Sequence, residues 1–340
     1  MTMQDALDGF IMDRKARGLS AATIMWYEYR IKATLQGALG RMMASVTIDD
    51  MRGLISAMRK GKKPSTINGH IRAVKALINW ADDEGLPIQF TPKRLHEVKE
   101  PQHVPVVLER EQIALMLQQP DRSTYIGVRA YTMMLLLADT GMRVGELVGL
   151  RVGDYSFPRI TVLGKGNKQR VCSVSDLMQE PMESYLVERS AAAKIMGWET
   201  DAMFINSVGG PLSKVSVQQM VATCARQAGI TDIHVTPHAF RSTYATHFLR
   251  QDGDITSLME SMGHTSLAMS LYYAKMSGVR AFNSRAKTAL DDSLVKSPPH
   301  RAASGEASVP AGAPARPRKY TRKMAHRMHE AGGADERKVL

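Results

Sequence analysis

Apolar residues recur every three or four positions along most of the chain, which is the spacing of one face of an α-helix. The pattern is clear in AATIMWYEYRIKATLQ and in STINGHIRAVKALINWADDEG, both within residues 1–98. Ser20 and Ser65 stand where helix N-caps are expected, and Gly85 followed by Pro87 is expected to stop the last helix. The pattern therefore predicts an all-helical N-terminal segment.

The helical pattern is interrupted between Thr91 and Val107, where prolines and charged residues follow one another without a sustained period. Such a composition is typical of a linker. From Leu108 the helical spacing resumes. Within this second region the runs RITVL and QRVCSV, on either side of residues 164–167, are rich in β-branched residues and predict one small antiparallel hairpin.

Together these patterns predict a fold class that is mainly α with a small antiparallel β-sheet, an α+β domain preceded by an all-α helical domain. We expect a helical domain at 1–98, a linker at 99–107, the mixed domain at 108–290 and a tail at 291–340. The tail is expected to be largely disordered, because 15 of the 19 residues from Ser297 to Ala315 are Pro, Gly, Ala or Ser.

Charge narrows the class of partner. The chain has 45 Lys and Arg against 33 Asp and Glu, a net charge of +12 that suits a polyanion. The tail from Lys296 is basic, with 10 Lys and Arg against 4 Asp and Glu. Nucleic acid is the leading class of partner, although ribosome-associated and membrane-surface proteins share this bias. On the N-terminal helices, basic residues around GKKPST are candidate DNA contacts, with a solvated helix face as the alternative: Lys62, Lys63, Arg72 and Lys75.

Other classes of protein are disfavoured. Cys172 and Cys224 are far apart and lack companions at metal-ligand spacing, so neither a zinc site nor a disulfide framework is expected. No window approaches ~18 uninterrupted apolar residues, and the first residues lack the cationic start and apolar run of a secretory signal. We therefore expect a cytoplasmic protein with no membrane partner.

Four short segments carry the polar residues with most chemical meaning, and the first is ADTGMRVGELVGL. Arg143 follows a turn and is expected to open a helix in which Glu146 lies one turn later. An exposed ion pair is the ordinary interpretation of that spacing. A role beyond an exposed ion pair is favoured by the position of Arg143. It follows directly after the apolar run from Met133 to Ala138, where a buried helix is expected to meet a turn.

The second segment is the tip of the predicted hairpin, GKGN, which carries Lys165. Its glycines permit close approach of the backbone to a ligand. A lysine at such a tip is equally typical of simple solubilising charge. The segment is not a phosphate-binding P-loop, because the GxxxxGK[ST] spacing is absent.

The third segment, VTPHAFRSTYATHFL, is expected to begin a helix at Thr236 or Pro237 and places His238 and Arg241 three residues apart, on one face. A cation and an imidazole near a helix start suit an anionic ligand, and a structural histidine is the alternative. The HExxH spacing of metalloproteases is missing.

The fourth segment is ESMGHTSLAMSLYYAK. Gly263 is expected to end one helix, and His264 is followed nine residues later by Tyr273, with Tyr272 beside it. Paired tyrosines at the end of an apolar helix are most often core packing, so this segment alone indicates little.

Taken in order, TGMRVGEL, GKGNKQR, HAFR and MGHTSLAMSLYY resemble the tyrosine recombinase family, which includes phage integrases and Xer-type recombinases. GLSAATIMWY and STINGHIRAVKALINWA are similar to the family's core-binding helices, so the resemblance covers roughly residues 5–285. It implies that 1–98 is a SAM-like core-binding domain, that 108–290 is the catalytic domain, and that the basic tail lies outside both.

The resemblance also implies roles for residues around a scissile phosphate: Arg143 and Arg241 as clamps, His238 and His264 as assisting groups, Lys165 as the acid for the leaving 5′ oxygen, Glu146 as a supporting acid and Tyr273 as the nucleophile. Two guanidiniums suit the charge of the transition state, whereas a phenol, with a reference pKa near ~10, needs a base or cation beside it. The implied product is a 3′-phosphotyrosyl linkage, formed with no metal and no nucleotide cofactor.

The implied partner is double-stranded DNA carrying core recombination sites, held by a homotetramer on synapsed DNA, with host or element-encoded accessory proteins as further candidates. The expected function is integration or excision of a phage or mobile element. Xer-like dimer resolution and a non-catalytic sequence-specific DNA-binding protein remain alternatives, as do a type IB topoisomerase-like or hairpin-resolving enzyme and an RNA-binding protein. Because the chain begins at these helices, we expect simple sites without an arm-binding domain.

Overall fold

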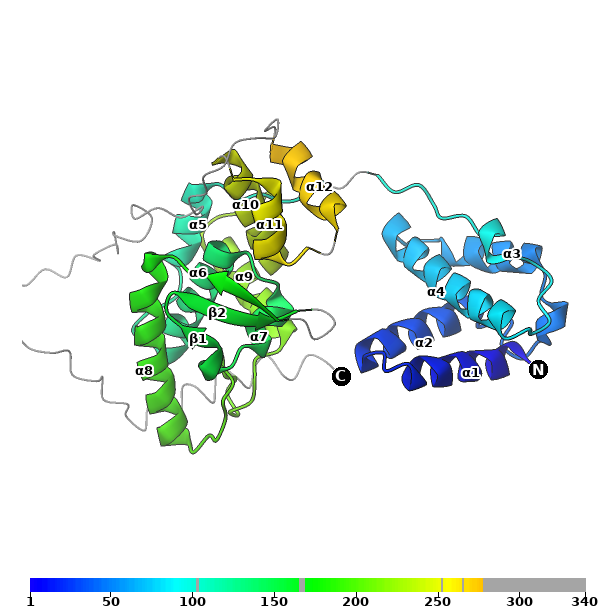
Figure 1. Ribbon diagram of the computed structural model, residues 1–340, viewed down its shortest axis with the longest axis horizontal. Helices are drawn as coiled ribbons and strands as arrows, with labels where there is room; N and C mark the ends of the chain where they lie inside the picture. Colours follow the sequence, from blue (N-terminus) through cyan, green and yellow to red (C-terminus); the bar gives the residue numbers. More distant parts are fainter. Residues whose placement is uncertain (102–103, 165–168, 252, 265, 278–340) are drawn as a thin grey trace, which may run out of the picture. The chain divides into compact units, whose positions relative to one another are not determined.

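The computed structural model describes residues 1–101, 104–164, 169–251, 253–264 and 266–277 (Figure 1). The chain divides into two compact units, Met1–His103 and Val104–Leu340, and each unit has a hydrophobic core of its own. Both are mainly helical, and the second carries one small antiparallel sheet, so the predicted fold class is confirmed. None of the described helices is long and apolar enough to span a membrane.

The first unit consists of four helices and two short 3-10 turns: α1 (Met3–Ala16), α2 (Ala21–Leu35), α3 (Ile48–Met58), α4 (Pro64–Asp83), and the turns Met43–Ser45 and Pro92–Arg94. The predicted N-cap Ser20 is confirmed, because its hydroxyl accepts the backbone N–H of Thr23. The cap predicted at Ser65 is wrong. Lys63 caps α4 and Pro64 takes the first helical position, where a missing N–H costs nothing and the fixed φ suits the helix.

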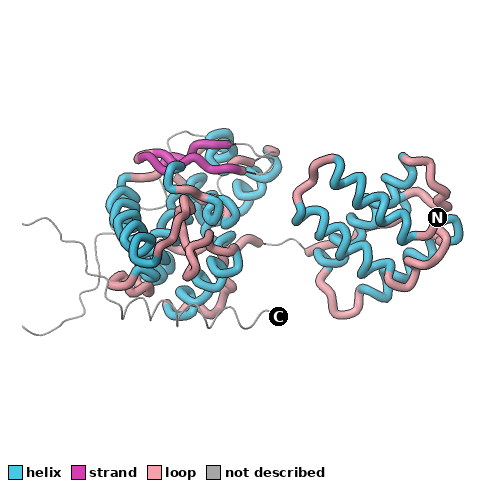
Figure 2. Tube along the Cα trace, turned by 90° about the horizontal axis from the view of Figure 1, so that it is seen from below, coloured by secondary structure: helices cyan, strands magenta, loops and turns pink. Residues whose placement is uncertain are grey.

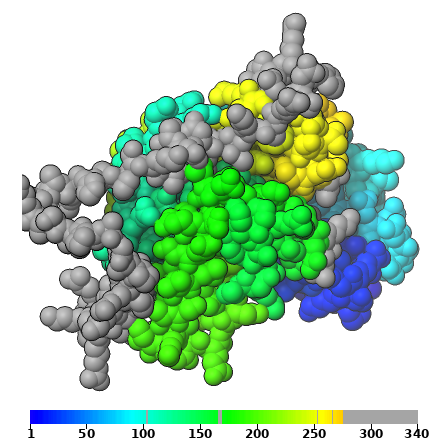
Figure 3. Space-filling model, turned by 60° about the vertical axis from the view of Figure 1, so that its left-hand side comes forward, coloured from blue at the N-terminus to red at the C-terminus, as the bar shows by residue number. Residues whose placement is uncertain are grey.

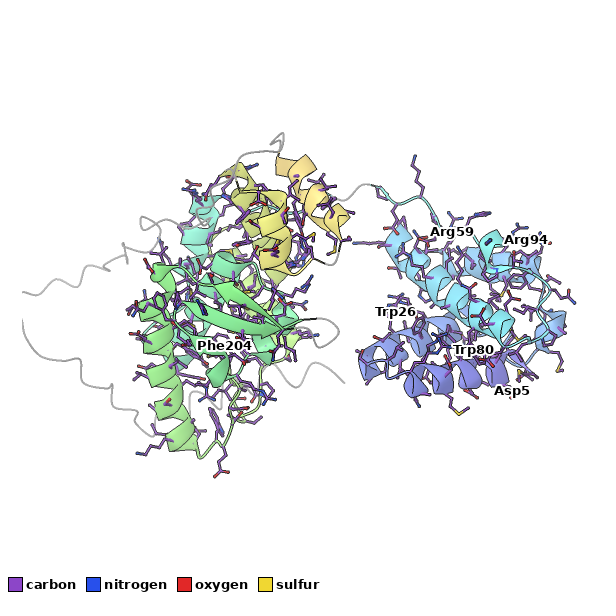
Figure 4. The ribbon with its side chains drawn as sticks, viewed as in Figure 1. Asp5, Trp26, Arg59, Trp80, Arg94 and Phe204 are labelled. Atoms are coloured by element: carbon purple, nitrogen blue, oxygen red, sulfur yellow. The ribbon has the colours of Figure 1, made fainter. Side chains whose placement is uncertain are left out.

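The core of the first unit is built from the apolar faces of α1, α2 and α4. Trp80, which is labelled in Figure 4, meets the ring of Phe10 edge-on, with centroids 5.9 Å apart. Phe10 also meets Tyr27, with centroids 5.2 Å apart. Across the same core the buried Thr34 and His70 side chains are joined by a hydrogen bond of 3.0 Å. The hydrophobic spacing read from the sequence therefore corresponds to one continuous buried interface.

The second unit contains eight helices within the described ranges: α5 (Arg110–Leu117), α6 (Tyr125–Thr140), α7 (Val144–Gly149), α8 (Gln179–Met196), α9 (Lys214–Gln227), α10 (Pro237–Arg250), α11 (Ile255–Met262) and α12 (Leu267–Ser277), with 3-10 turns at Val152–Asp154 and Asp176–Met178. Helix α6 forms the centre, since every residue from Tyr131 to Thr140 is buried. A helix that is apolar all round belongs inside a core. The surrounding core therefore fixes the position of the end of α6, and with it the start of the residues that follow Thr140.

The sheet has the strand order β1 (Tyr155–Ser156), β2 (Arg159–Leu163) and β3 (Gln169–Ser173), with both pairs antiparallel. The hairpin predicted from the β-branched runs is confirmed, while residues 165–168 of its loop lie outside the described residues. Figure 2 shows the strands together at one edge of the unit, with helices beside them. Strand alternation puts Arg170 on the same side as the buried Cys172, toward those helices.

Helices α10, α11 and α12 pack together and form a small apolar cluster that includes Tyr244, Met262 and Tyr273 (Figure 1). Helix α11 also contacts β3, and Figure 3 shows the surface of α10 and α11 directly beside that of the hairpin region. The described segments that hold the first, third and fourth motifs, together with the strands on either side of the second, thus lie in one part of the second unit.

Candidate active site

Arg143 is placed by the turn that ends α6. Gly141 takes the left-handed conformation, with φ +59°, and its N–H donates to the Leu137 carbonyl. A Cβ at Gly141 would lie 2.6 Å from the Tyr244 ring, so both conformation and space require glycine. Two residues later Arg143 caps α7. Its guanidinium side chain is 36% exposed and therefore accessible to a ligand.

Glu146 is buried between two arginines. Its carboxylate accepts the Arg143 backbone N–H at 2.7 Å and Arg143 Nη1 at 2.9 Å. On its other side Arg170 donates from both Nη atoms, at 2.7 and 2.8 Å. Burial raises the pKa of Glu146, but the hydrogen bonds from Arg170 and from the Arg143 backbone outweigh it and lower that pKa to about 2. Glu146 is therefore an anion at any physiological pH.

Arg170 was not among the predicted site residues. A weak signal for it exists in the sequence, because a charged residue stands two positions before Cys172 and so faces the buried side of the same strand. The partner Glu146 lies 24 residues earlier, and no local spacing rule connects them.

Arg241 lies on the buried side of α10, with 3% of its surface exposed. Its Nη1 donates to the Gly141 carbonyl and its Nη2 to the Met262 carbonyl, both at 2.7 Å. Burial and the nearby positive charge of Arg143 lower the pKa of Arg241 to about 10, so it remains charged at neutral pH. Arg241 thus joins the α6 turn to the end of α11 while bringing a second positive charge close to Arg143.

Three successive carbonyl oxygens at the end of α11 each accept a hydrogen bond from a different arginine: Ser261 from Arg170 Nε at 3.1 Å, Met262 from Arg241 Nη2 at 2.7 Å and Gly263 from Arg143 Nη2 at 3.3 Å. The last carbonyls of a helix have no partner inside it, and they form the negative end of the helix dipole. Gly263, with φ +60°, ends the helix as predicted. The three arginines are therefore held close together, against their mutual repulsion, by one helix end.

His264 and Tyr273 follow directly from that helix end. His264 Nδ1 is 2.8 Å from the Ser270 hydroxyl, and its ring stacks on Tyr273 with centroids 5.9 Å apart and an interplanar angle of 9°. Among the described residues the buried Nε2 of His264 has no hydrogen-bond partner. Tyr273 is 6% exposed, whereas Tyr272 is 38% exposed and meets Tyr273 edge-on.

Burial, followed by the charges of Arg241, Arg143 and Arg170, lowers the pKa of His264 to about 4. The imidazole is therefore neutral at physiological pH, and its Nε2 could form a hydrogen bond with a ligand. The positive charge of the arginines, with a neutral imidazole beside it, suits an anion that also accepts hydrogen bonds, such as a phosphate diester.

This lowered pKa predicts a pH dependence of stability. An unfolded chain binds a proton at His264 below about pH 6.5, the ordinary value, whereas the folded protein resists protonation until about pH 4. Stability is therefore full above pH 6.5 and falls as the pH drops toward 4, by at most about 1.4 kcal/mol per pH unit for one group. We expect His264→Gln to flatten this slope in urea unfolding measured between pH 7.5 and pH 4.5. Equal slopes in the two proteins would contradict the prediction.

His238 and Lys165 complete the set of predicted site residues. His238, in the first turn of α10, is exposed, whereas Arg241 three residues later is buried. A three-residue spacing keeps two residues at neighbouring positions of a helix surface, so their difference in exposure reflects what packs against α10. Lys165 lies outside the described residues. The structure brings together Arg143, Glu146, Arg241, His264 and Tyr273 through the hydrogen bonds and ring contacts above.

The predicted DNA contacts on the first unit have different surroundings. Lys62 and Lys63 are exposed at the start of α4, and Lys75 is half-buried. Arg72 is exposed but donates to Glu97 at 2.6 Å, and its pKa is raised, first of all by that hydrogen bond. Lys62 and Lys63 are therefore the accessible pair, while a phosphate would have to displace Glu97 from Arg72.

The second unit matches the model of the phage integrase family over residues 106–278. The tyrosine recombinase XerD of Listeria innocua is 28% identical over 290 residues, covering 82% of this chain and 96% of that protein. XerC of Corynebacterium efficiens is 31% identical over 270 residues, with 77% and 84% covered. Among solved structures, a lambda integrase dimer bound to a core site has a TM-score of 0.65 at 19% identity, covering 84% of this chain and 99% of that one.

Proposed function

The chain belongs to the phage integrase family, as a tyrosine-type site-specific recombinase that exchanges DNA strands, and we propose that Tyr273 is its nucleophile. The observation that carries this proposal is the stack of Tyr273 on His264, beside a cluster of positive charge. Arg241 interacts electrostatically with the Tyr273 phenol. A cation at this position stabilises the negative charge that builds up on an attacking oxygen.

In the proposed reaction the Tyr273 oxygen forms a bond to the scissile phosphorus while the bond from phosphorus to the 5′ oxygen breaks. The phenol gives its proton to solvent water, the 5′ oxygen receives one from Lys165, and Lys165 regains a proton from solvent. The products are a 3′-phosphotyrosyl linkage and a free 5′ hydroxyl. Attack by the 5′ hydroxyl of a second strand reverses the chemistry, and the retained phosphoester energy makes a nucleotide unnecessary.

Arg143 and Arg241 are proposed to hold the nonbridging oxygens, on which the transition state concentrates charge. Arg143 is the accessible fork, and Arg241 is the buried one, fixed by two carbonyls before any DNA arrives. A site that is already organised needs little reorganisation when charge develops. His264 is proposed to donate or accept a hydrogen bond at the phosphate through Nε2, and His238 is proposed to assist. Glu146 is proposed to support Arg143 through the hydrogen bonds between them.

We further propose that residues 1–98 bind the core site, with Lys62 and Lys63 on phosphates, and that a homotetramer acts on two synapsed duplexes. Support comes from fold-level relatives, whose solved forms include a lambda integrase dimer on a core site and a lambda integrase tetramer on a Holliday junction. For the biological programme we propose integration or excision of a mobile element. Xer-type dimer resolution is the second candidate, favoured by the near full-length similarity to XerD.

The chemistry can be tested by trapping. A core site is first selected by binding from a library of randomised duplexes, and a nicked suicide substrate is built on it. The expected result is a covalent protein–DNA adduct that peptide mapping assigns to Tyr273. A non-catalytic DNA-binding protein gives no adduct, and that outcome would sink the proposal.

The programme is tested with two labelled sites. An integrase is expected to join sites carried on two separate duplexes, whereas a dimer resolvase is expected to recombine only sites on one molecule. Relaxation of supercoils without joined products would instead favour a topoisomerase-like enzyme.

A further inference from the structure

Arg170 is the one guanidinium of the cluster that is fully engaged by protein. Its Nε donates to the Ser261 carbonyl, and its two Nη atoms donate to the two oxygens of Glu146. Its side chain is 13% exposed, compared with 36% for Arg143. With each nitrogen already directed at a protein oxygen, Arg170 is poorly placed to bind a phosphate. It is well placed to hold other groups.

The site is shaped around this arginine. A Cβ at Gly263 would lie 3.1 to 3.3 Å from Cδ, Nη1 and Nε of Arg170, so a side chain there would press on the guanidinium. Strand β3 directs Arg170 inward beside the buried Cys172, and the carboxylate that it meets is 4% exposed. A surface ion pair has none of these features. Because Arg170 is closely surrounded, it fixes the orientation of the Glu146 carboxylate that it binds.

The charges explain what Arg170 would do for Arg143. Glu146 is a buried anion with two oxygens, and Arg143 reaches only one of them with its guanidinium. The second Arg143 Nη donates to the Gly263 carbonyl. Without Arg170, Arg143 would be the one arginine that the described structure shows hydrogen-bonded to this carboxylate, and a bidentate pair with it would be the favoured arrangement. The Arg143 fork would then turn away from an incoming phosphate.

We propose that Arg170 is a positioning residue: by saturating Glu146 and holding the end of α11, it keeps Arg143 directed at the scissile phosphate and His264 beside Tyr273. The proposal rests on the proposed function of this site. The proposal gives β3 a role in the reaction as well as in the hairpin, because Arg170 of that strand connects the start of α7 to the end of α11.

The test uses single-turnover cleavage of the nicked suicide substrate by the full-length protein. Arg170→Met is expected to lower the rate by about 10²-fold, comparable to losing one preorganised donor at an oxyanion, with DNA affinity within about threefold of wild type since Arg170 makes no phosphate contact. The double variant Arg170→Met, Glu146→Gln is expected to recover at least about tenfold of the loss, because an uncharged partner no longer captures Arg143.

A merely structural role would not give that recovery, nor would it change the pH profile. Burial still raises the pKa of Glu146 when Arg170 is removed, and the first of the hydrogen bonds that lower that pKa is lost. In Arg170→Met the rate relative to wild type is therefore expected to rise as the pH falls from 8 to 5.5, because protonation of Glu146 releases Arg143. Arg170→Lys keeps the charge but cannot pair with both oxygens, and it is expected to lose about tenfold. Arg170→Lys also tests the proposal if the methionine variant fails to fold.

Arg151→Met is the matched control, because it removes an exposed partner of Asp201 in the same unit. This variant is expected to cleave normally.

The proposal would be overturned if Arg170→Met cleaved at the wild-type rate, or if the double variant cleaved no faster than Arg170→Met.

Inorganic phosphate supplies a readout that needs no DNA. Phosphate should raise the unfolding temperature of wild type more than that of Arg170→Met, at equal ionic strength. If wild type forms no adduct but this difference is present, the proposed function fails and the positioning role stands. An equal phosphate effect in both proteins would refute the positioning role alone.

Discussion

Tyr273→Phe is expected to slow formation of the covalent DNA adduct by on the order of 10⁴-fold or more, the effect of removing a nucleophile. The substitution deletes one hydroxyl and keeps the ring that stacks on His264 and packs in the α10–α12 cluster. Stability and DNA affinity should therefore change little. The measurement is the fraction of suicide substrate that stays attached to protein in a denaturing gel, beside a gel-shift measurement of binding.

Tyr272→Phe is the matched control, because it removes the same hydroxyl from the neighbouring residue of α12. Tyr272 is 38% exposed and lies edge-on to Tyr273, away from the stack on His264. This variant is expected to form the adduct at close to the wild-type rate. If it loses the adduct while Tyr273→Phe keeps it, the nucleophile has been assigned to the wrong tyrosine.

Arg241→Lys is expected to lower single-turnover cleavage by about 10² to 10³-fold, as expected for loss of a preorganised donor at the transition state. Lysine keeps the charge, but one ammonium cannot reach the Gly141 and Met262 carbonyls together with a phosphate oxygen. At least one buried carbonyl then lacks its donor, which costs about 1–3 kcal/mol of folding stability. Both effects are measured on one preparation, by suicide-substrate kinetics and by urea unfolding.

The second unit offers a matched control in Arg189. This residue is also buried and also donates to backbone carbonyls, those of Thr200, Ala202 and Met203. None of its partners belongs to the candidate site. Arg189→Lys is expected to cost similar stability while the folded fraction cleaves normally. Equal losses of cleavage in the two variants would show that Arg241 acts through folding alone.

The elements and much of the site follow from local rules. The Arg143–Glu146 pair comes from a three-residue helical spacing, and the helix starts at Ser20 and Thr236 come from side chains or prolines that suit a first turn. The misplaced cap at Ser65 shows the limit of such rules. Two adjacent residues, Pro64 and Ser65, both suit a helix start, and local chemistry does not rank them.

What the sequence did not reveal depends on distant contacts. Arg170 reaches Ser261 across 91 positions. The difference in exposure between His238 and Arg241 is set by what packs against α10, not by the helix itself. On the first unit, Asn68 binds the backbone of Val98 through both its amide oxygen and nitrogen, and Arg72 pairs with Glu97 beside it. A segment that composition describes only as a linker is thereby attached to α4.

The hydrogen bonds that build the site join segments that are far apart in the chain, so the complete cluster requires that all of these segments have been synthesised. Arg241 donates to a carbonyl 100 residues earlier, and the α11 end accepts from Arg143 across 120 residues. Contacts of such sequence separation form late, because a long loop must close before they contribute. A growing chain released only as far as α9 would hold Arg143 and Glu146 but lack Arg241, His264 and Tyr273. If Tyr273 is the nucleophile as proposed, a chain that ends at α9 is expected to form no covalent adduct with DNA.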